Sequence, residues 1–448
     1  MRESHLKNMI EKPVQRLKTS LWFIIVSILI IYLVNNLFSV INMEKETWEF
    51  PYLFPYIKPI GTDFRIGMFY PAMVLLEGLS PYEHYNLIYP PFAAVFSIPF
   101  RLFDVKTAYL LQVILLYAAN IITIYIAARS ASLGLDKDKK LDILNPALSI
   151  VCLSMVFLTL NSYGFLFSLE RGNFDIYAQF FSVLGLWMLL KRSEQSRDSY
   201  HIWLQVVLVS LAAHLKVYPA ILFFLILWKH GWKSLLPLFT VNLILLLCTG
   251  PVYAWQFIQT IIHYTQEPFI WIGNHSGASF ADFANSYMSS RLGFTLPALI
   301  FTVVPLLVWV VGVIVLWRRE RTPANALLFF CLSIPVMNLV PTVSHDYKLV
   351  ILSAPLTIAL YWLVRSYSET GKVMELAKMA AFLILALFLT RLNSITPLVL
   401  KNKYPFILVM EGLFALMILF PGKLEKATQV QLSNETASHM TPDISTPG

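Results

Sequence analysis

The chain has 448 residues, of which 57% are hydrophobic and only 13% are charged. A soluble fold cannot bury so much apolar surface behind so few charged residues, so this composition excludes a soluble globular protein. The formal net charge of +8 does not indicate nucleic-acid binding, because Lys and Arg lie in short segments between apolar runs. The composition predicts an all-α, polytopic membrane helical bundle that forms one membrane domain, over residues 20–421.

Apolar runs in chain order predict about twelve transmembrane helices. The first run, 20–42, follows a cytoplasmic segment 1–19 and is too long for the core of a signal peptide, so it is expected to remain as a signal anchor. The run 201–229 exceeds one span, and Lys216 and Pro219 interrupt it, so it is interpreted as two short helices. The other runs are 107–129, 144–162, 174–191, 234–250, 297–317, 324–340, 348–365, 374–391 and 405–420.

Lys and Arg set the expected orientation of these helices, because they concentrate in cytoplasmic loops. With the N-terminus inside, most of them fall in predicted cytoplasmic segments, including Lys229, Lys233 and the cluster at 318–321. A single span over 201–229 would place that cluster outside. The prediction is a multi-pass protein of the plasma (inner) membrane with both termini in the cytoplasm, the C-terminal one as a polar, disordered tail over 422–448.

Two predicted outer loops, 44–106 and 251–296, are much longer than the others, and long ordered loops are often functional. Within the first loop, 64–79 and 89–103 are apolar but short, with prolines near their ends. These two stretches are predicted to be helices that lie at the membrane interface.

Asp63 stands just before the first of these interfacial helices. A partly desolvated carboxylate there could act as a general base that takes a proton from an acceptor hydroxyl. Asp is also a good helix N-cap, so a capping role is the alternative, and the two roles are compatible.

Ionisable residues gather at the predicted outer ends of later spans. The segment 170–175 contains Glu170, Arg171 and Asp175, which must form ion pairs or face a wet cavity beside the membrane core. A purely structural pair of Arg171 with Glu170 or with Asp175 is the alternative. Lys216 stands at the break between two short helices, where its ammonium group needs an anion unless it reaches the interface by snorkelling.

Two further segments are candidates for substrate contact. The segment 273–277 contains Asn274 and His275 and is either a surface turn or a substrate contact. The segment 341–348 concentrates His, Asp, Tyr and Lys beside two predicted spans, which favours function. The acidic and His residues lack metal-site spacing, and no Gly-rich phosphate loop or dinucleotide fingerprint occurs. Metal binding and a nucleotide-bound donor are therefore not expected.

In this order the motifs resemble those of membrane glycosyltransferases of the GT-C fold, most closely the bacterial alpha-1,2-mannosyltransferase-like family. The matching features are Asp63, the Gly-x-x-Pro-Tyr turn at 78–82, Tyr-Pro-Pro at 89–91, Gly172-Asn173, Leu-Lys-x-x-Pro at 215–219, Asn-x-Ser at 274–276 and the loop at 344–348. Two departures concern substrate identity: Asn173 replaces a more usual Gln, and Tyr347-Lys348 stands where a second His is common.

The resemblance implies inverting transfer of a hexose, expected to be mannose, from a polyprenyl-phosphate donor to a lipid or glycan acceptor on the outer face. Asp63 would be the base, and Lys216, His345 and Lys348 would bind the donor phosphate without a metal or other cofactor. The remaining residues expected to contact substrate are Arg65, Tyr89, Glu170, Arg171, Asn173, Asn274, His275, Asp346 and Tyr347.

Besides a noncatalytic assembly subunit, in which Asp63, Lys216 and His345 would not converge in space, two alternatives remain at this stage. One is a related transferase of the same fold that uses another sugar, such as arabinose, or another acceptor. The other is a transporter for lipid-linked glycans, since twelve spans also suit secondary transporters; however, these usually show internal repeats and charges near the bilayer midplane, which this sequence lacks.

Overall fold

The computed structural model describes residues 61–85, 87–135, 146–191, 199–266, 274–371, 374, 377–382, 385 and 402–420. Within these ranges the regular structure is helical, and the only β-type pairing is an isolated antiparallel bridge between Asn274 and His345. The all-α prediction is confirmed for this part of the chain. The predicted first span, 20–42, the segment 1–19 and the tail 422–448 lie outside the described residues.

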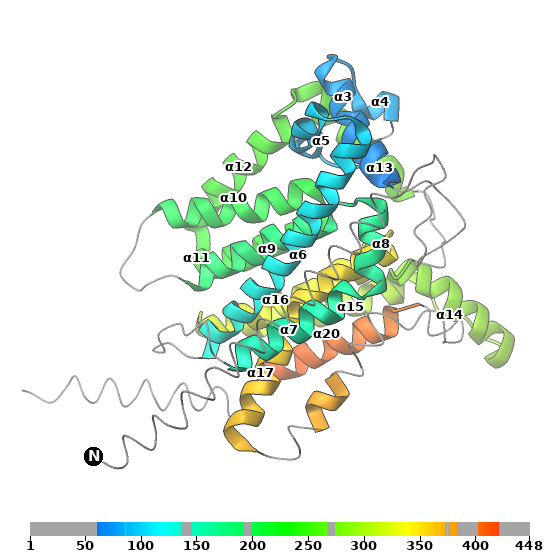
Figure 1. Cartoon of the computed structure of the whole chain (residues 1–448). Coiled ribbons are helices and arrows are strands. Elements are labelled where there is room, and N and C mark those ends of the chain that lie inside the picture. The colour runs from blue at the N-terminus through cyan, green and yellow to red at the C-terminus, as the bar shows by residue number, and fades with distance from the viewer. Residues whose placement is uncertain are drawn as a thin grey trace, which may run out of the picture.

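Short helices make up the described part of the first long loop, from residue 61 onward, as the sequence predicts for 64–79 and 89–103 (Figure 1). They are α2 (Thr62–Phe64), the π-helix η1 (Arg65–Phe69), α3 (Tyr70–Leu76), α4 (Pro81–Tyr85), α5 (Pro91–Ser97) and the 3-10 helix η2 (Ile98–Leu102). Pro71 and Pro91 lie in the first turns of α3 and α5, where a missing N–H costs no helical hydrogen bond. The π-helix begins two residues after Asp63, and such segments often occur at functional sites.

The central helices are α6 (Val105–Leu135), α7 (Pro146–Leu160), α8 (Tyr163–Arg171) and α9 (Asp175–Leu190). The sequence analysis did not foresee α8, which is bent by 58° from α7. Ser162 starts α8 by accepting a hydrogen bond from the backbone N–H of Phe165 at 3.2 Å. Helix α8 packs along the 3-10 helix η5 (Asp346–Leu352), with Gly164 against Leu349 and the ring of Phe167 stacked on that of Tyr347.

The predicted interruption at Lys216 is confirmed. Helix α10 (Ser199–Leu215) ends just before this residue, and the 3-10 helix η3 (Tyr218–Leu222) follows, with Pro219 in its first turn. The chain continues through α11 (Phe223–His230), η4 (Gly231–Ser234) and α12 (Leu235–Leu247). Because α10 packs on both α9 and α12, the break at Lys216 lies among helices and not at a free chain end.

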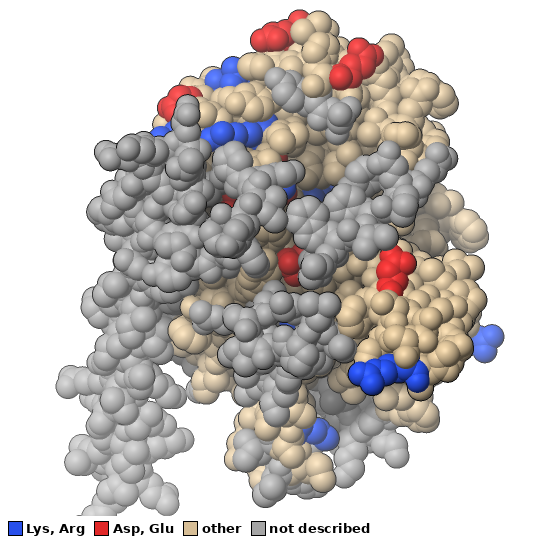
Figure 2. All heavy atoms as spheres, turned by 90° about the vertical axis from the view of Figure 1, so that its right-hand side faces the viewer, with Lys and Arg blue, Asp and Glu red and all other residues tan. Residues whose placement is uncertain are grey.

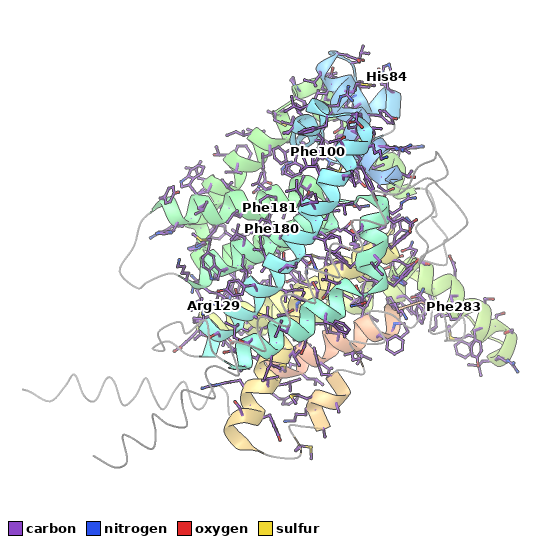
Figure 3. All side chains as sticks on the ribbon, in the orientation of Figure 1. His84, Phe100, Arg129, Phe180, Phe181 and Phe283 are labelled. Carbon is purple, nitrogen blue, oxygen red and sulfur yellow. The ribbon has the colours of Figure 1, made fainter. Side chains whose placement is uncertain are left out.

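The second long loop also contains helices, α13 (Pro251–Gln266) and α14 (Gly277–Leu292). Phe283 marks α14, which projects from the side of the bundle (Figure 3). The remaining helices are α15 (Ala298–Trp317), α16 (Pro323–Leu339), α17 (Ser353–Thr370) and α20 (Tyr404–Leu419). Helices α15, α16 and α20 pack against one another, and α17 packs against α6 and α7.

Several helices have the length and apolar character of membrane spans. In the described ranges these are Val105–Gly134, Tyr218–Leu247, Ala298–Trp317 and Asp346–Ser368, four in number, or five if the bent pair α7 and α8 is one span. Other predicted spans correspond to shorter apolar helices, for example Asp175–Leu190 and Pro323–Leu339. Most of the predicted span 374–391 lies outside the described residues.

The bundle exposes large apolar side chains on its outer surface, such as Phe239, Ile244 and Leu299, each more than 60% exposed. Such a surface is suited to lipid and not to water. His84 of α4 and Arg129 of α6 lie at opposite ends of the helical body (Figure 3). The described part of the first long loop and the end of α6 that carries Arg129 thus lie at opposite ends of the body.

Candidate functional site

Asp63 lies in the first turn of the first described helix, and its side chain does not cap that helix. The N-cap position belongs to Gly61, which has φ 69° and forms no side-chain cap. The Asp63 carboxylate instead forms an ion pair with Arg171 through Oδ1 and accepts a hydrogen bond from Asn173 Nδ2 at 2.8 Å through Oδ2. The predicted capping role is therefore not the one observed. The side chain remains 15% exposed, so a small group can reach it.

Gly172 is the reason that both neighbouring residues can reach Asp63. It ends α8 in the left-handed conformation, with φ 68°. A Cβ at this position would lie 2.7 Å from Cβ of Phe64, closer than atoms can approach. Gly172 therefore permits both the turn and the close packing of α8 on α2. The Arg171 side chain pairs across this contact with Asp63 and with neither of the two acidic residues considered from sequence.

Lys216 is buried, with 8% of its surface exposed, so it does not snorkel to the interface. Its Nζ lies 3.2 Å from Asp175 Oδ2 and donates a hydrogen bond to the hydroxyl oxygen of Tyr89 at 3.3 Å. The Asp175 carboxylate also accepts a hydrogen bond of 2.6 Å from the Tyr218 hydroxyl. Asp175 and Tyr218 are thus members of the site that the sequence analysis did not assign.

Charge balance around Lys216 keeps its ammonium group protonated. Burial by itself lowers the pKa of Lys216, but the carboxylates of Asp175 and Asp63 act in the opposite direction, so the pKa of Lys216 lies above its ordinary value. Burial also raises the pKa of Tyr89, whose hydroxyl therefore stays neutral. The charges of both Asp63 and Asp175 act on Tyr89, so this residue lies within electrostatic reach of the two carboxylates.

The late polar segment completes the site. His345 lies close enough to Asp63, Arg171 and Lys216 for their charges to affect it, and its ring is 5.3 Å from that of Tyr347. Burial lowers the pKa of His345 to about 4, although Asp63 and Asp346 oppose this shift. His345 is therefore a neutral imidazole at physiological pH.

Tyr347 and Lys348 lie on the Lys216 side of the site. The ammonium of Lys216 is 5.4 Å from the ring centroid of Tyr347. Lys348 is 3% exposed, and its Nζ lies 4.1 Å above the ring of Tyr218. The two lysines therefore share the neighbourhood of Asp175 and Tyr218, and their predicted role in phosphate binding stays a prediction.

Asn274 and His275 hold backbone segments together. Asn274 Nδ2 donates to the Thr342 carbonyl at 2.9 Å, and its Oδ1 accepts from the backbone N–H of Ser344 at 2.8 Å. His275 Nδ1 accepts from the backbone N–H of Lys403 at 3.1 Å, so Nε2 carries the proton and donates to Asp346 Oδ1 at 2.6 Å. Their predicted contact with substrate stays a prediction, because these polar atoms already have partners.

Arg65 and Glu170 lie at the rim of the same cluster. Both act electrostatically on Tyr109, whose hydroxyl donates to the carbonyl of Leu169 at 2.7 Å. The Glu170 carbonyl accepts from the backbone N–H of Gly61 at 2.7 Å, which holds α8 beside α2. Tyr163, at the other end of α8, hydrogen-bonds to Asp346. The structure therefore gathers the predicted residues Asp63, Arg65, Tyr89, Glu170, Arg171, Asn173, Lys216, His345, Asp346, Tyr347 and Lys348 into one region, to which Asn274 and His275 attach by backbone contacts.

Sequence reasoning missed Tyr218, Tyr163, Asn402 and Lys403, and it named Asp175 as an ionisable residue without giving it a role in the site. Asp175 was visible as the first residue of an apolar run directly after the Gly-Asn motif, and an acidic residue entering a membrane helix is a signal by itself. Asn402 donates to the Asn274 carbonyl at 3.2 Å, but nothing in its local sequence marks that contact.

Chemically, the site combines a carboxylate that accepts hydrogen bonds from Arg171 and Asn173, a neutral imidazole and two lysines. In the described ranges, no group of three or more His, Cys, Asp and Glu residues is placed to hold a metal ion. Figure 2 views the molecule from the side on which α8 lies in Figure 1. On this face, few of the described residues are Lys, Arg, Asp or Glu. Proton transfer and anion binding are the reactions that these residues can support.

A model of a protein family described as glycosyltransferase family 87 matches residues 87–344. The chain belongs to glycosyltransferase family 87. It is therefore a glycosyltransferase, and its apolar helices make it a membrane glycosyltransferase. No curated protein and no solved structure matches the chain. The matched residues include Arg171, Asn173 and Lys216. Asp63 lies before the matched range and His345 directly after it, and the fold places both near Arg171.

Proposed function

We propose that this family 87 enzyme transfers a hexose, expected to be mannose, from a polyprenyl-phosphate donor to a hydroxyl of a lipid or glycan acceptor. The transfer takes place on the outer face of the membrane, in a GT-C arrangement of about twelve spans. One observation carries the proposal: a carboxylate held by Arg171 and Asn173 lies in the same small region as two buried lysines and a neutral His. A base and an anion site side by side are what this reaction needs.

In the proposed reaction, Asp63 accepts the proton of the acceptor hydroxyl while that oxygen attacks the anomeric carbon of the sugar. The bond between this carbon and the phosphate oxygen breaks, and its electron pair leaves with the polyprenyl phosphate. Attack opposite the leaving group inverts the anomeric configuration. Arg171 and Asn173 hold the carboxylate in one orientation and occupy one lone pair of each oxygen, so the remaining lone pairs can accept the proton.

The leaving phosphate is already an anion of low basicity, so it needs cationic stabilisation more than protonation. Lys216 and Lys348 are placed to supply it, and the neutral His345 can donate one hydrogen bond from its protonated ring nitrogen. For this reason the proposed transfer needs no metal ion, and we expect activity to persist in the presence of EDTA.

The choice of a mannosyl donor rests on the order of the motifs from Asp63 to the 344–348 loop, while the apolar surface of the bundle suits a lipid-linked donor that enters from the bilayer. Both substrates are therefore expected to approach within or beside the membrane.

A transfer assay with purified protein in lipid nanodiscs tests the proposal. Radiolabelled polyprenyl-phosphate mannose and a membrane-lipid extract are the substrates, and wild type is compared with Asp63→Asn. Asp282→Asn, which changes an exposed aspartate on α14, is the matched control. We expect Asp63→Asn to lower the transfer rate by about 10²- to 10⁴-fold, while the control keeps the wild-type rate.

Near wild-type transfer by folded Asp63→Asn protein would contradict the assignment of the base. Absence of product from the wild type with mannose, but not with a polyprenyl-phosphate arabinose, would keep the reaction type and change the sugar.

A further inference from the structure

Asp175 is a buried carboxylate for which the proposed reaction gives no role. It is the first residue of α9, and its surface is 0% exposed. Both oxygens are engaged, Oδ1 with the Tyr218 hydroxyl at 2.6 Å and Oδ2 with Lys216 Nζ at 3.2 Å. Breaking such a buried pair is costly, so this carboxylate fixes the groups around it.

The ammonium group of Lys216 has three N–H donors. The ammonium forms an ion pair with Asp175 and donates a hydrogen bond to the Tyr89 hydroxyl, while the aromatic faces of Tyr89 and Tyr347 lie 4.5 Å and 5.4 Å from Nζ. These contacts fix the position of the Lys216 ammonium and leave at least one of its N–H donors for a further acceptor. An anion that binds there does not have to order the Lys216 side chain, because its existing contacts already hold the ammonium group in place.

The second lysine is held by the partner of Asp175. Lys348 Nζ lies 4.1 Å above the ring of Tyr218 and forms no ion pair among the described residues. Because the Tyr218 hydroxyl donates to the Asp175 carboxylate, electron density shifts into the phenol ring and strengthens its attraction for a cation. Asp175 therefore acts on Lys216 by direct contact and on Lys348 through one aromatic ring.

We propose that Asp175 is a positioning residue that fixes Lys216 and Lys348 together as one phosphate-binding pair, so that the site selects a phosphate over an uncharged headgroup. The inference rests on the proposed function in so far as that function places a phosphate at these lysines. It adds that a buried carboxylate, itself repulsive to phosphate, is needed for phosphate to bind.

This role makes a prediction opposite to that of simple charge counting. Replacing Asp175 by Asn makes the site more positive by one charge, which by Coulomb attraction alone strengthens phosphate binding. If Asp175 positions the lysines, the same change frees Lys216 and weakens the hold of Tyr218 on Lys348, so phosphate binding becomes weaker. The sign of the change distinguishes the two accounts.

The experiment measures binding of farnesyl phosphate and of farnesol to the purified full-length chain in nanodiscs, by titration calorimetry against empty nanodiscs. Farnesol reports the contribution of the isoprenoid tail, and the ratio of the two affinities reports the phosphate site. We expect the wild type to prefer the phosphate, and Asp175→Asn to lower this preference by at least about tenfold without changing farnesol binding. Asp282→Asn is the matched control and keeps the preference.

Two variants of Tyr218 separate its ring from its hydroxyl. Tyr218→Phe keeps the ring beneath Lys348 and loses the hydrogen bond to Asp175, whereas Tyr218→Leu loses both. We expect the phosphate preference to fall in the order wild type, Phe, Leu. Folding of Asp175→Asn is checked by its elution profile and thermal unfolding. If it does not fold, the two Tyr218 variants test the inference instead. A phosphate preference that is the same in Tyr218→Phe and Tyr218→Leu would overturn it.

A double variant tests whether Asp175 acts through Lys216. If it does, Asp175→Asn lowers the phosphate preference less when Lys216 is already Met than when Lys216 is present. A preference that is unchanged or stronger in Asp175→Asn would overturn the inference and leave the proposed donor site intact. A wild type that does not distinguish farnesyl phosphate from farnesol would overturn the donor site and this inference together.

Discussion

Gly67 lies directly against the ring of Tyr89: a Cβ on Gly67 would stand 2.6 Å from Cε2 of that ring. Gly67 belongs to the π-helix η1 that follows Asp63, while Tyr89 accepts the hydrogen bond from Lys216. On its other side, the Tyr89 ring packs edge-on against Phe174 with centroids 5.2 Å apart. The missing side chain of Gly67 therefore leaves room for the ring whose hydroxyl accepts the hydrogen bond from Lys216.

Gly67→Ala should displace the Tyr89 ring and with it the ammonium of Lys216. Gly67 has no positive φ, so the backbone tolerates Ala and the effect is steric. We expect kcat/KM to fall by about 10- to 100-fold, because misplacements of about 1 Å in an active site cost this much. Gly412→Ala is the matched control, since nothing lies within 4 Å of a Cβ there. Equal activity of the two variants in the transfer assay would contradict the prediction.

Arg171→Gln should impair transfer because Asp63 loses its ion-pair partner while Asn173 remains. We expect a fall in kcat of about 10- to 100-fold, in keeping with the loss of a charge-assisted hydrogen bond that orients a base. Steady-state rates at saturating donor measure this effect. Arg291→Gln, at an exposed position on α14, serves as the control. Unchanged kcat in folded Arg171→Gln protein would show that Asp63 needs no counterion.

His345 should not titrate near neutral pH. Its pKa of about 4 lies below the ordinary value of about 6.5, because burial disfavours the charged imidazolium. The neutral form therefore contributes stability that is present above about pH 6.5 and is lost as the pH falls through about 4. We expect wild type to lose thermal stability relative to His345→Gln over this range. A difference between the two unfolding midpoints that stays constant with pH would contradict the assignment.

Asn274→Ala should destabilise the protein more than it changes substrate affinity. The variant loses hydrogen bonds to Thr342 and Ser344 and leaves buried backbone groups without partners, which costs about 1–3 kcal/mol for each such group. Thermal unfolding is expected to shift to lower temperature, with the KM for the donor little changed. A raised KM with normal stability would instead support the substrate contact predicted from the sequence.

Much of this protein was determined by local features of its sequence. Long apolar runs require helices in a membrane, since each helix satisfies its own backbone hydrogen bonds. The break at Lys216 follows from a charge and a proline within an apolar run, and the short helices after Asp63 follow from short apolar segments bounded by prolines. The order of the polar motifs also indicated which residues would meet.

Only the tertiary structure decided how those residues pair. Arg171 had two acidic residues close to it in the sequence, yet it binds Asp63, 108 positions away, because Gly172 lets α8 pack against α2. Lys216 pairs with Asp175 because α10 packs on α9. The ring of His275 accepts a hydrogen bond from the backbone N–H of Lys403, 128 positions later. Local sequence sets the length and polarity of each helix, but the choice of a buried charge's partner depends on which helices pack together. That packing is a property of the whole bundle, and no single segment encodes it.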